Sequence, residues 1–123
     1  MANEFAHIEL MTHDPDGARK FYSAIFDWKW EEYPMDTGPY WMIDTGTDPK
    51  GGIMKAPHPD IPPHWMVYAK VEDVAATLEK VKDLGGTIIV EKTPIPEMGA
   101  FGTFQDPTGG MMAVWEARPE STD

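Results

Sequence analysis

Asp48-Pro49-Lys50-Gly51-Gly52-Ile53-Met54 decides the fold, because a close copy, Asp106-Pro107-Thr108-Gly109-Gly110-Met111-Met112, follows 58 positions later in a chain of 123 residues. That spacing is close to half of the chain, which predicts a duplicated module. An Asp-Pro pair opens turns and glycine supplies positive φ angles. We therefore expect both glycine pairs to be turn residues that precede a strand.

The residues around the two copies predict the same order of elements twice, β-α-β-β-β. Alternating polar and apolar residues indicate half-buried strands, and apolar residues at helical spacing indicate two helices. Asp14 before Pro15 and Asp73 before Val74 are typical helix starts. The predicted strands are 4–11, 28–33, 40–45, 52–56, 64–71, 87–91, 99–105 and 111–116, with helices over 15–26 and 74–84.

Proline-rich segments are predicted to lie outside the strands. Residues 34–39 are expected to form a turn and residues 93–98 a loop. Residues 57–63 are expected to be a stiff linker between modules 1–56 and 64–118 of a single domain, 1–123. The predicted class is α+β.

The composition excludes several classes of function. The formal net charge of −11 disfavours nucleic acids and anionic membranes as partners. The absence of cysteine excludes disulfides, a thiolate nucleophile and Cys-ligated zinc. No apolar run is long enough to span a bilayer, and the first residues lack the pattern of a signal peptide. We expect a cytoplasmic protein.

Three segments together resemble the glyoxalase/bleomycin resistance protein/extradiol dioxygenase (vicinal oxygen chelate) superfamily. They are His7-Ile8-Glu9-Leu10 with Asp14 and Phe21-Tyr22, the helix within Val71–Gly86, and Phe104-Gln105-Asp106-Pro107. The resemblance implies paired βαβββ modules that form a cupped mixed sheet with the helices outside, often in a homodimer.

The resemblance also implies where metal-dependent members hold a divalent ion. The four ligand positions fall on His7, Met66, Lys55 and Ala113, and only His7 offers a suitable donor. Because even a catalytic zinc site uses about three protein ligands, we expect neither the standard site nor another cofactor. The alternative is a shifted site of His7, Glu9 and His64 for nickel, zinc, iron or manganese.

Two strand faces carry the candidate site residues. His7 and Glu9 share one face of the first strand, so a carboxylate could orient an imidazole for acid/base catalysis. The mixed faces of the strands in the second module predict an apolar, deformable pocket for a small molecule. Ordinary core or dimer contacts would explain that pattern equally well. The expected pocket residues are His64, Met66, Tyr68, Lys70, Met111, Ala113 and Trp115.

Two classes of function follow. The first is a metal-free protein that binds a small molecule in the cup of the sheet, as a bleomycin resistance-like factor would. The second is an enzyme of the superfamily, a lyase, isomerase or dioxygenase acting on a small carbonyl or aromatic compound. It would use a divalent metal or the acid/base pair of His7 and Glu9.

Overall fold

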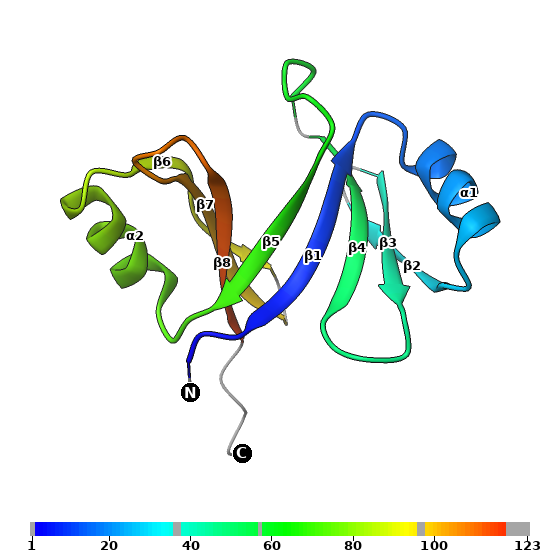
Figure 1. Ribbon diagram of the computed structural model, residues 1–123, viewed down its shortest axis with the longest axis horizontal. Coiled ribbons are helices and arrows are strands. Elements are labelled where there is room, and N and C mark those ends of the chain that lie inside the picture. Colours follow the sequence, from blue (N-terminus) through cyan, green and yellow to red (C-terminus); the bar gives the residue numbers. More distant parts are fainter. Residues whose placement is uncertain (1, 36–37, 57, 96–97, 118–123) are drawn as a thin grey trace. The chain divides into compact units, whose positions relative to one another are not determined.

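The computed structural model describes residues 2–35, 38–56, 58–95 and 98–117. Contacts divide the chain into an N-terminal unit, Ala6–Val67, and a C-terminal unit, Met1–Phe5 with Tyr68–Asp123. The described residues form eight strands and two helices, and the order β-α-β-β-β occurs twice (Figure 1). The predicted α+β class with two βαβββ repeats is therefore confirmed.

The N-terminal unit places its four strands in the order β2-β3-β4-β1. β1 and β4 run parallel, while the β2–β3 and β3–β4 pairs are antiparallel. The register joins Glu9 to Gly52 and Gly52 to Met42, so these residues form one row across three strands. The bounds are Phe5–Thr12 for β1, Lys29–Met35 for β2, Gly38–Asp44 for β3 and Lys50–Lys55 for β4.

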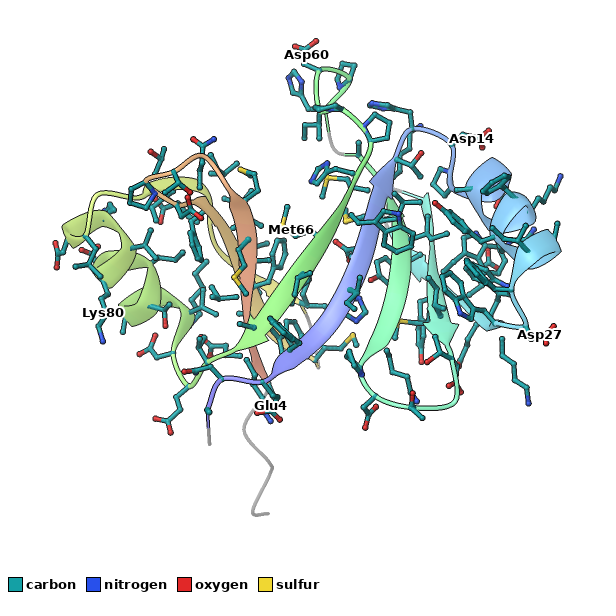
Figure 2. The ribbon with its side chains drawn as sticks, viewed as in Figure 1. Glu4, Asp14, Asp27, Asp60, Met66 and Lys80 are labelled. Carbon is teal, nitrogen blue, oxygen red and sulfur yellow. The ribbon has the colours of Figure 1, made fainter. Side chains whose placement is uncertain are left out.

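Helix α1, Pro15–Ile25, begins as the sequence predicts. The Asp14 carboxylate accepts a hydrogen bond of 2.9 Å from the Gly17 N–H, and Pro15 occupies the first turn, where its missing N–H has no cost. Figure 2 labels Asp14 and Asp27, which flank the two ends of the helix. The helix contacts β3 and β4, which fixes the apolar face of this sheet.

A buried cluster of Leu10, Ile43 and Ile53 forms the core of the N-terminal unit. These residues come from β1, β3 and β4 and lie on one face of the sheet, because side chains alternate along each strand. The cluster packs against half-buried residues that include Ala18 and Tyr22 of α1. The opposite face, which carries His7, Glu9 and Tyr40, is therefore available for polar groups, and we call it the polar face.

The C-terminal unit repeats the plan with the strand order β5-β8-β7-β6. β5 pairs in parallel with β8, whereas β7 is antiparallel to both β8 and β6. Helix α2, Val74–Asp83, is capped by Asp73, whose carboxylate accepts from the Ala76 N–H at 3.0 Å. The strand bounds are His64–Lys70 for β5, Thr87–Ile95 for β6, Gly99–Gln105 for β7 and Met111–Ala117 for β8.

The core of the C-terminal unit lies between α2 and its sheet. Val74 and Leu78 of the helix pack against Val114 of β8, and all three side chains are buried. The helix ends at Asp83, and Gly85 just beyond its cap has a φ angle of 94°, which is typical of a glycine after a helix. Neither α1 nor α2, the helices of the described residues, has the length and apolar character needed to cross a membrane.

Three predictions from proline and glycine were wrong in detail. β6 continues to Ile95 through part of the predicted loop 93–98, because an edge strand with register shifts tolerates Pro94. The predicted turn 34–39 is reduced, because Pro34 and Pro39 pair in the β2–β3 hairpin. β4 begins at Lys50 and not at the predicted Gly52, so Gly51 lies inside the strand and not in the preceding turn. Residues 36, 37, 57, 96, 97 and 118–123 lie outside the described residues.

The described part of the predicted linker 57–63 is tied to its neighbours by two histidines. The His13 Nε2–H donates to the Ile61 carbonyl and the His64 Nδ1–H donates to the Pro62 carbonyl, each at 2.7 Å. A carbonyl oxygen can only accept a hydrogen bond, so these contacts fix which ring nitrogen carries the proton. Asp60 lies at the tip of this segment (Figure 2).

Candidate functional site

The polar face of the N-terminal unit brings together a histidine, a tyrosine and a glutamate from two strands. His7 and Glu9 lie two residues apart on β1, so their side chains point to the same face. Tyr40 comes from β3, on the other side of β4. Its hydroxyl lies 2.6 Å from Glu9 Oε2 and 2.6 Å from His7 Nε2.

The hydrogen-bond geometry assigns a direction to this chain of groups. A tyrosine hydroxyl has one proton, and Tyr40 donates it to the Glu9 carboxylate. The contact with His7 Nε2 then requires the imidazole to donate its Nε2–H to the hydroxyl oxygen. The order is therefore His7 Nε2–H to Tyr40 Oη–H to Glu9 Oε2. This tautomer puts the lone pair of the neutral imidazole on Nδ1.

Burial keeps His7 neutral. Desolvation lowers the pKa of His7 from 6.5 to about 4, since a charged imidazolium would lose its hydration. His7 Nε2 and Glu9 Oε2 are 3.9 Å apart, which would count as an ion pair if the ring were protonated. With the pKa near 4 the ring is uncharged at pH 7, so we treat the contact as two ends of a hydrogen-bonded chain. Glu9 is only 5% exposed, and its carboxylate accepts the Tyr40 hydroxyl.

Gly52 makes the chain of hydrogen bonds possible. Strands lie about 4.8 Å apart, so the Tyr40 side chain must cross β4 to reach β1. A Cβ atom placed on Gly52 would overlap the Tyr40 hydroxyl and ring. The absence of a side chain at this buried position therefore leaves the space that Tyr40 occupies.

A pocket of about 300 Å³ in the same unit is lined by residues of β2, β3 and the start of β4. Trp30 and Ile43 also line it, although their side chains alternate toward the core face. The other lining residues alternate toward the polar face: Lys29, Glu31, Tyr33, Met42, Asp44 and Lys50. The volume is at the lower end of the range for ligand pockets.

Charged groups of both signs flank the pocket. Lys50 Nζ lies 3.2 Å from Asp44 Oδ1 and 3.8 Å from Asp48 Oδ1. The pKa of Asp44 is lowered, first by the hydrogen bond from the Gly46 N–H and then by Lys50. Lys50 also pairs in register with His7, so the two residues lie in the same row of the polar face.

The residues predicted on β5 and β8 are placed within the strands as expected. In the C-terminal unit, Tyr68 is opposite Ala113 and Lys70 is opposite Trp115. Tyr68 and Ala113 are buried, whereas Met111 is 44% exposed. The Tyr68 ring lies 6.3 Å from the Phe101 ring.

His64 and Met66 belong to the N-terminal unit. Met66 is buried at 5% exposure (Figure 2 labels it on β5), and the His64 Nδ1–H is engaged with the Pro62 carbonyl. Of the predicted acid/base and metal residues, the structure brings His7 and Glu9 together through Tyr40.

The described residues do not fit the standard metal site. Met66 and Ala113 offer no hard donor, and Lys55 points to the face of β4 opposite Gly52, in register with Thr12. Within the described ranges, no three His, Asp or Glu side chains converge on one point. Tyr40 Oη already contacts both His7 and Glu9, the two possible donors that β1 places on the polar face.

Tyr40 and the lysines of the pocket were missed by the sequence reasoning. Tyr40 was assigned to a strand, but no local pattern connects β3 to β1 across a third strand. Gly52 was the available signal, because a glycine inside a strand often marks a close approach of another group. The Asp-Pro-x-Gly-Gly pattern instead predicts a turn residue at the start of the strand 52–56.

Comparisons with known proteins agree with this geometry. A family model described as Glyoxalase/Bleomycin resistance protein/Dioxygenase superfamily matches residues 4–114. "Putative glyoxylase CFP32" of Mycobacterium tuberculosis is 35% identical over 113 residues, which are 91% of this chain and 43% of that protein. "Anthracycline biosynthesis protein DnrV" of Streptomyces peucetius is 32% identical over 118 residues, 90% of this chain and 40% of that protein. The chain thus spans less than half of the length of these two relatives.

A solved structure has the same fold. Methylmalonyl-CoA epimerase from Mycobacterium tuberculosis superposes with a TM-score of 0.69 at 14% identity, covering 94% of this chain and 88% of that chain. At that identity the similarity concerns the fold alone.

Proposed function

Because the chain belongs to the glyoxalase/bleomycin resistance protein/dioxygenase superfamily, we propose that it binds a small organic molecule on the polar face without the family's standard metal site. One observation carries the proposal. The Tyr40 hydroxyl is held at 2.6 Å from both His7 and Glu9, on the sheet face that also carries most lining residues of a pocket of about 300 Å³. A few fixed polar groups together with a partly apolar pocket are typical of small-molecule sites.

A thermal-shift panel of small carbonyl and aromatic compounds tests this proposal. A compound that binds only the native state at 100 times its Kd stabilises the protein by about 2.7 kcal/mol. We expect at least one compound to raise Tm in the wild type and to lose that effect in Tyr40→Phe. The proposal is contradicted if no compound raises Tm, or if the rise is the same in the wild type and in Tyr40→Phe.

The metal-free part has its own test in the same assay. Nickel, zinc, iron and manganese are each expected to leave Tm unchanged, because the standard ligand positions carry Met66, Lys55 and Ala113. A metal-dependent rise in Tm that disappears in His7→Ala would contradict the metal-free proposal and support the shifted metal site of His7, Glu9 and His64. His13→Ala is the matched control, because His13 bonds to a backbone carbonyl away from Glu9.

The second candidate is an acid/base enzyme, which the direction of the hydrogen-bond chain favours. A proton accepted by the neutral His7 ring could pass from Nε2 to Tyr40 Oη while the Tyr40 proton moves to Glu9 Oε2. The net transfer from substrate to a carboxylate suits proton abstraction beside a carbonyl, as in lyases and isomerases. Deuterium exchange at that carbon, followed by NMR, is expected in the wild type and lost in Tyr40→Phe.

We also propose that two copies associate, as the family resemblance implies. Support comes from large apolar side chains exposed at α1 and its end, with Phe21 at 60%, Ile25 at 54% and Phe26 at 45%. Light scattering of the purified chain is expected to give twice the monomer mass. Phe21→Ser combined with Phe26→Ser should return it to the monomer, and a wild-type monomer at micromolar concentration refutes the association.

A further inference from the structure

We infer that the pocket over β2, β3 and β4 holds the carboxylate of an amphipathic acid, with Lys50 and Lys29 as its cationic partners. The inference rests on the proposed function, because it names the chemical class of the molecule bound on the polar face. Its basis is the position of the two lysines, the weakness of the present ion pairs of Lys50 and the apolar residues beside them.

Lys50 is placed to hold an anionic group next to the hydrogen-bonded chain. It pairs in register with His7 on the neighbouring parallel strand, and both side chains point to the polar face. Lys29 reaches the same pocket from β2, and its register partner is Asp44. A carboxylate between the two ammonium groups would place the rest of the molecule along Tyr33 and Met42, which also line the pocket.

The present partners of Lys50 are easily replaced. Its pairs with Asp44 and Asp48 join side chains that are 42%, 52% and 91% exposed. Exposed ion pairs of this kind contribute little to stability, so exchanging one carboxylate for that of a ligand has a small cost. Asp44 would keep its strongest hydrogen bond, the 2.8 Å contact from the Gly46 N–H.

The remaining lining residues select the kind of acid. Tyr33 and Met42 provide an aromatic and a deformable apolar wall. Asp44 and Glu31 also line the pocket, so a ligand carboxylate takes the place of one present partner of Lys50 and the pocket suits one negative charge better than two. The expected ligand is therefore a monocarboxylate with a small flat apolar body.

The test compares benzoate, benzamide and benzylamine, which share a ring and differ in the charge of the head group. Backbone amide shifts in an NMR titration report both the Kd and whether β2, β3 and β4 are the strands affected. We expect benzoate to bind there at least about tenfold more tightly than benzamide, as one charge-assisted hydrogen bond allows. Added salt should weaken benzoate alone.

Lys50→Met keeps the apolar stem and removes the charge, so it should raise the Kd of benzoate about tenfold and leave that of benzamide unchanged. Lys80→Met is the matched control on α2, where Lys80 is exposed and belongs to the other unit. Equal binding of benzoate and benzamide, tighter binding of benzylamine or no effect of Lys50→Met overturns the inference. If benzamide binds equally well and Tyr40→Phe abolishes that binding, the proposed function stands and only the carboxylate inference falls. If none of the three probes shifts these strands, the inference also falls, while the compound panel decides the proposed function separately.

Discussion

The two Asp-Pro-x-Gly-Gly stretches share their aspartate, proline and two glycines but lie at different positions relative to the strand that follows. In the N-terminal unit β4 begins at Lys50, so Gly51 and Gly52 are strand residues. In the C-terminal unit β8 begins at Met111, so Gly109 and Gly110 belong to the turn before it. Relative to the strand that follows, the motif is shifted by three positions.

The shift gives the two glycine pairs different physical roles. In the second copy the Asp106 carboxylate accepts hydrogen bonds from the Thr108 hydroxyl at 2.7 Å, the Gly110 N–H at 3.1 Å and the Thr108 N–H at 2.7 Å, and these contacts lower its pKa. In the first copy Gly52 provides the space for Tyr40. One sequence motif therefore shapes a turn in one unit and a candidate site in the other.

The largest expected effect comes from Gly52→Ala. The added methyl group would displace Tyr40, so overpacking and the loss of the Glu9 hydrogen bond together should cost about 3 kcal/mol of unfolding free energy. Chemical denaturation measures this cost.

A double-mutant cycle gives the control for Gly52→Ala. In a Tyr40→Ala background the space is empty, so Gly52→Ala should cost well under about 1 kcal/mol. Equal costs in both backgrounds would show that Tyr40 does not depend on Gly52.

The second prediction concerns the pH dependence of stability. It tests the N-terminal unit, because His7 belongs to that unit. Its pKa is lowered to about 4 in the folded state, so the unfolded state binds the additional proton between pH 6.5 and 4. Stability contributed by the neutral ring is therefore present above pH 6.5 and lost as the pH falls toward 4, by about 3 kcal/mol. The unfolding free energies of the wild type and of His7→Gln are measured at pH 7 and at pH 4. The wild type should lose more unfolding free energy between these two pH values than His7→Gln does, and the excess is the contribution of His7. The same acid sensitivity in His7→Gln would refute this assignment.

The sequence predicted the elements better than it predicted the site, and Gly52 shows why. Capping by Asp14 and Asp73 and the alternation along β1 are local signals, so the helices and the shared face of His7 and Glu9 could be predicted. The approach of Tyr40 to β1 depends on the register of three strands. A shift of one residue would move Tyr40 to the other face, and no local pattern fixes that register.

The first Asp-Pro-x-Gly-Gly motif is typical of a turn, yet its glycine pair lies in a strand. Turn chemistry assigns a preference to Gly51 and Gly52 but does not fix where the strand begins. In this unit the turn before β4 contains a hydrogen bond of 2.8 Å from the Gly46 N–H to the Asp44 carboxylate. Gly51 and Gly52 follow this turn and lie in the strand.

The third prediction is a smaller change at the same site. Tyr40→Phe keeps the ring over Gly52 and removes the hydroxyl that Glu9 accepts from, so it should cost about 2 kcal/mol. Denaturation of the variant measures the cost, and Tyr33→Phe, at an exposed tyrosine of the same sheet, is the control. A neutral Tyr40→Phe would mean that the hydroxyl contributes nothing to the fold.

The smallest effect is expected for the second copy of the motif. Gly109 has a φ angle of 100°, and a Cβ atom there would meet nothing within 4 Å. The cost of Gly109→Ala is therefore backbone strain alone, about 1–2 kcal/mol. Because Gly109 and Tyr40 belong to different units, the affinity for any ligand that depends on Tyr40 should stay unchanged in this variant, measured by the same thermal shift. A glycine in the turn would then affect stability only, while Gly52 affects both stability and binding, and a loss of binding in Gly109→Ala would remove that distinction.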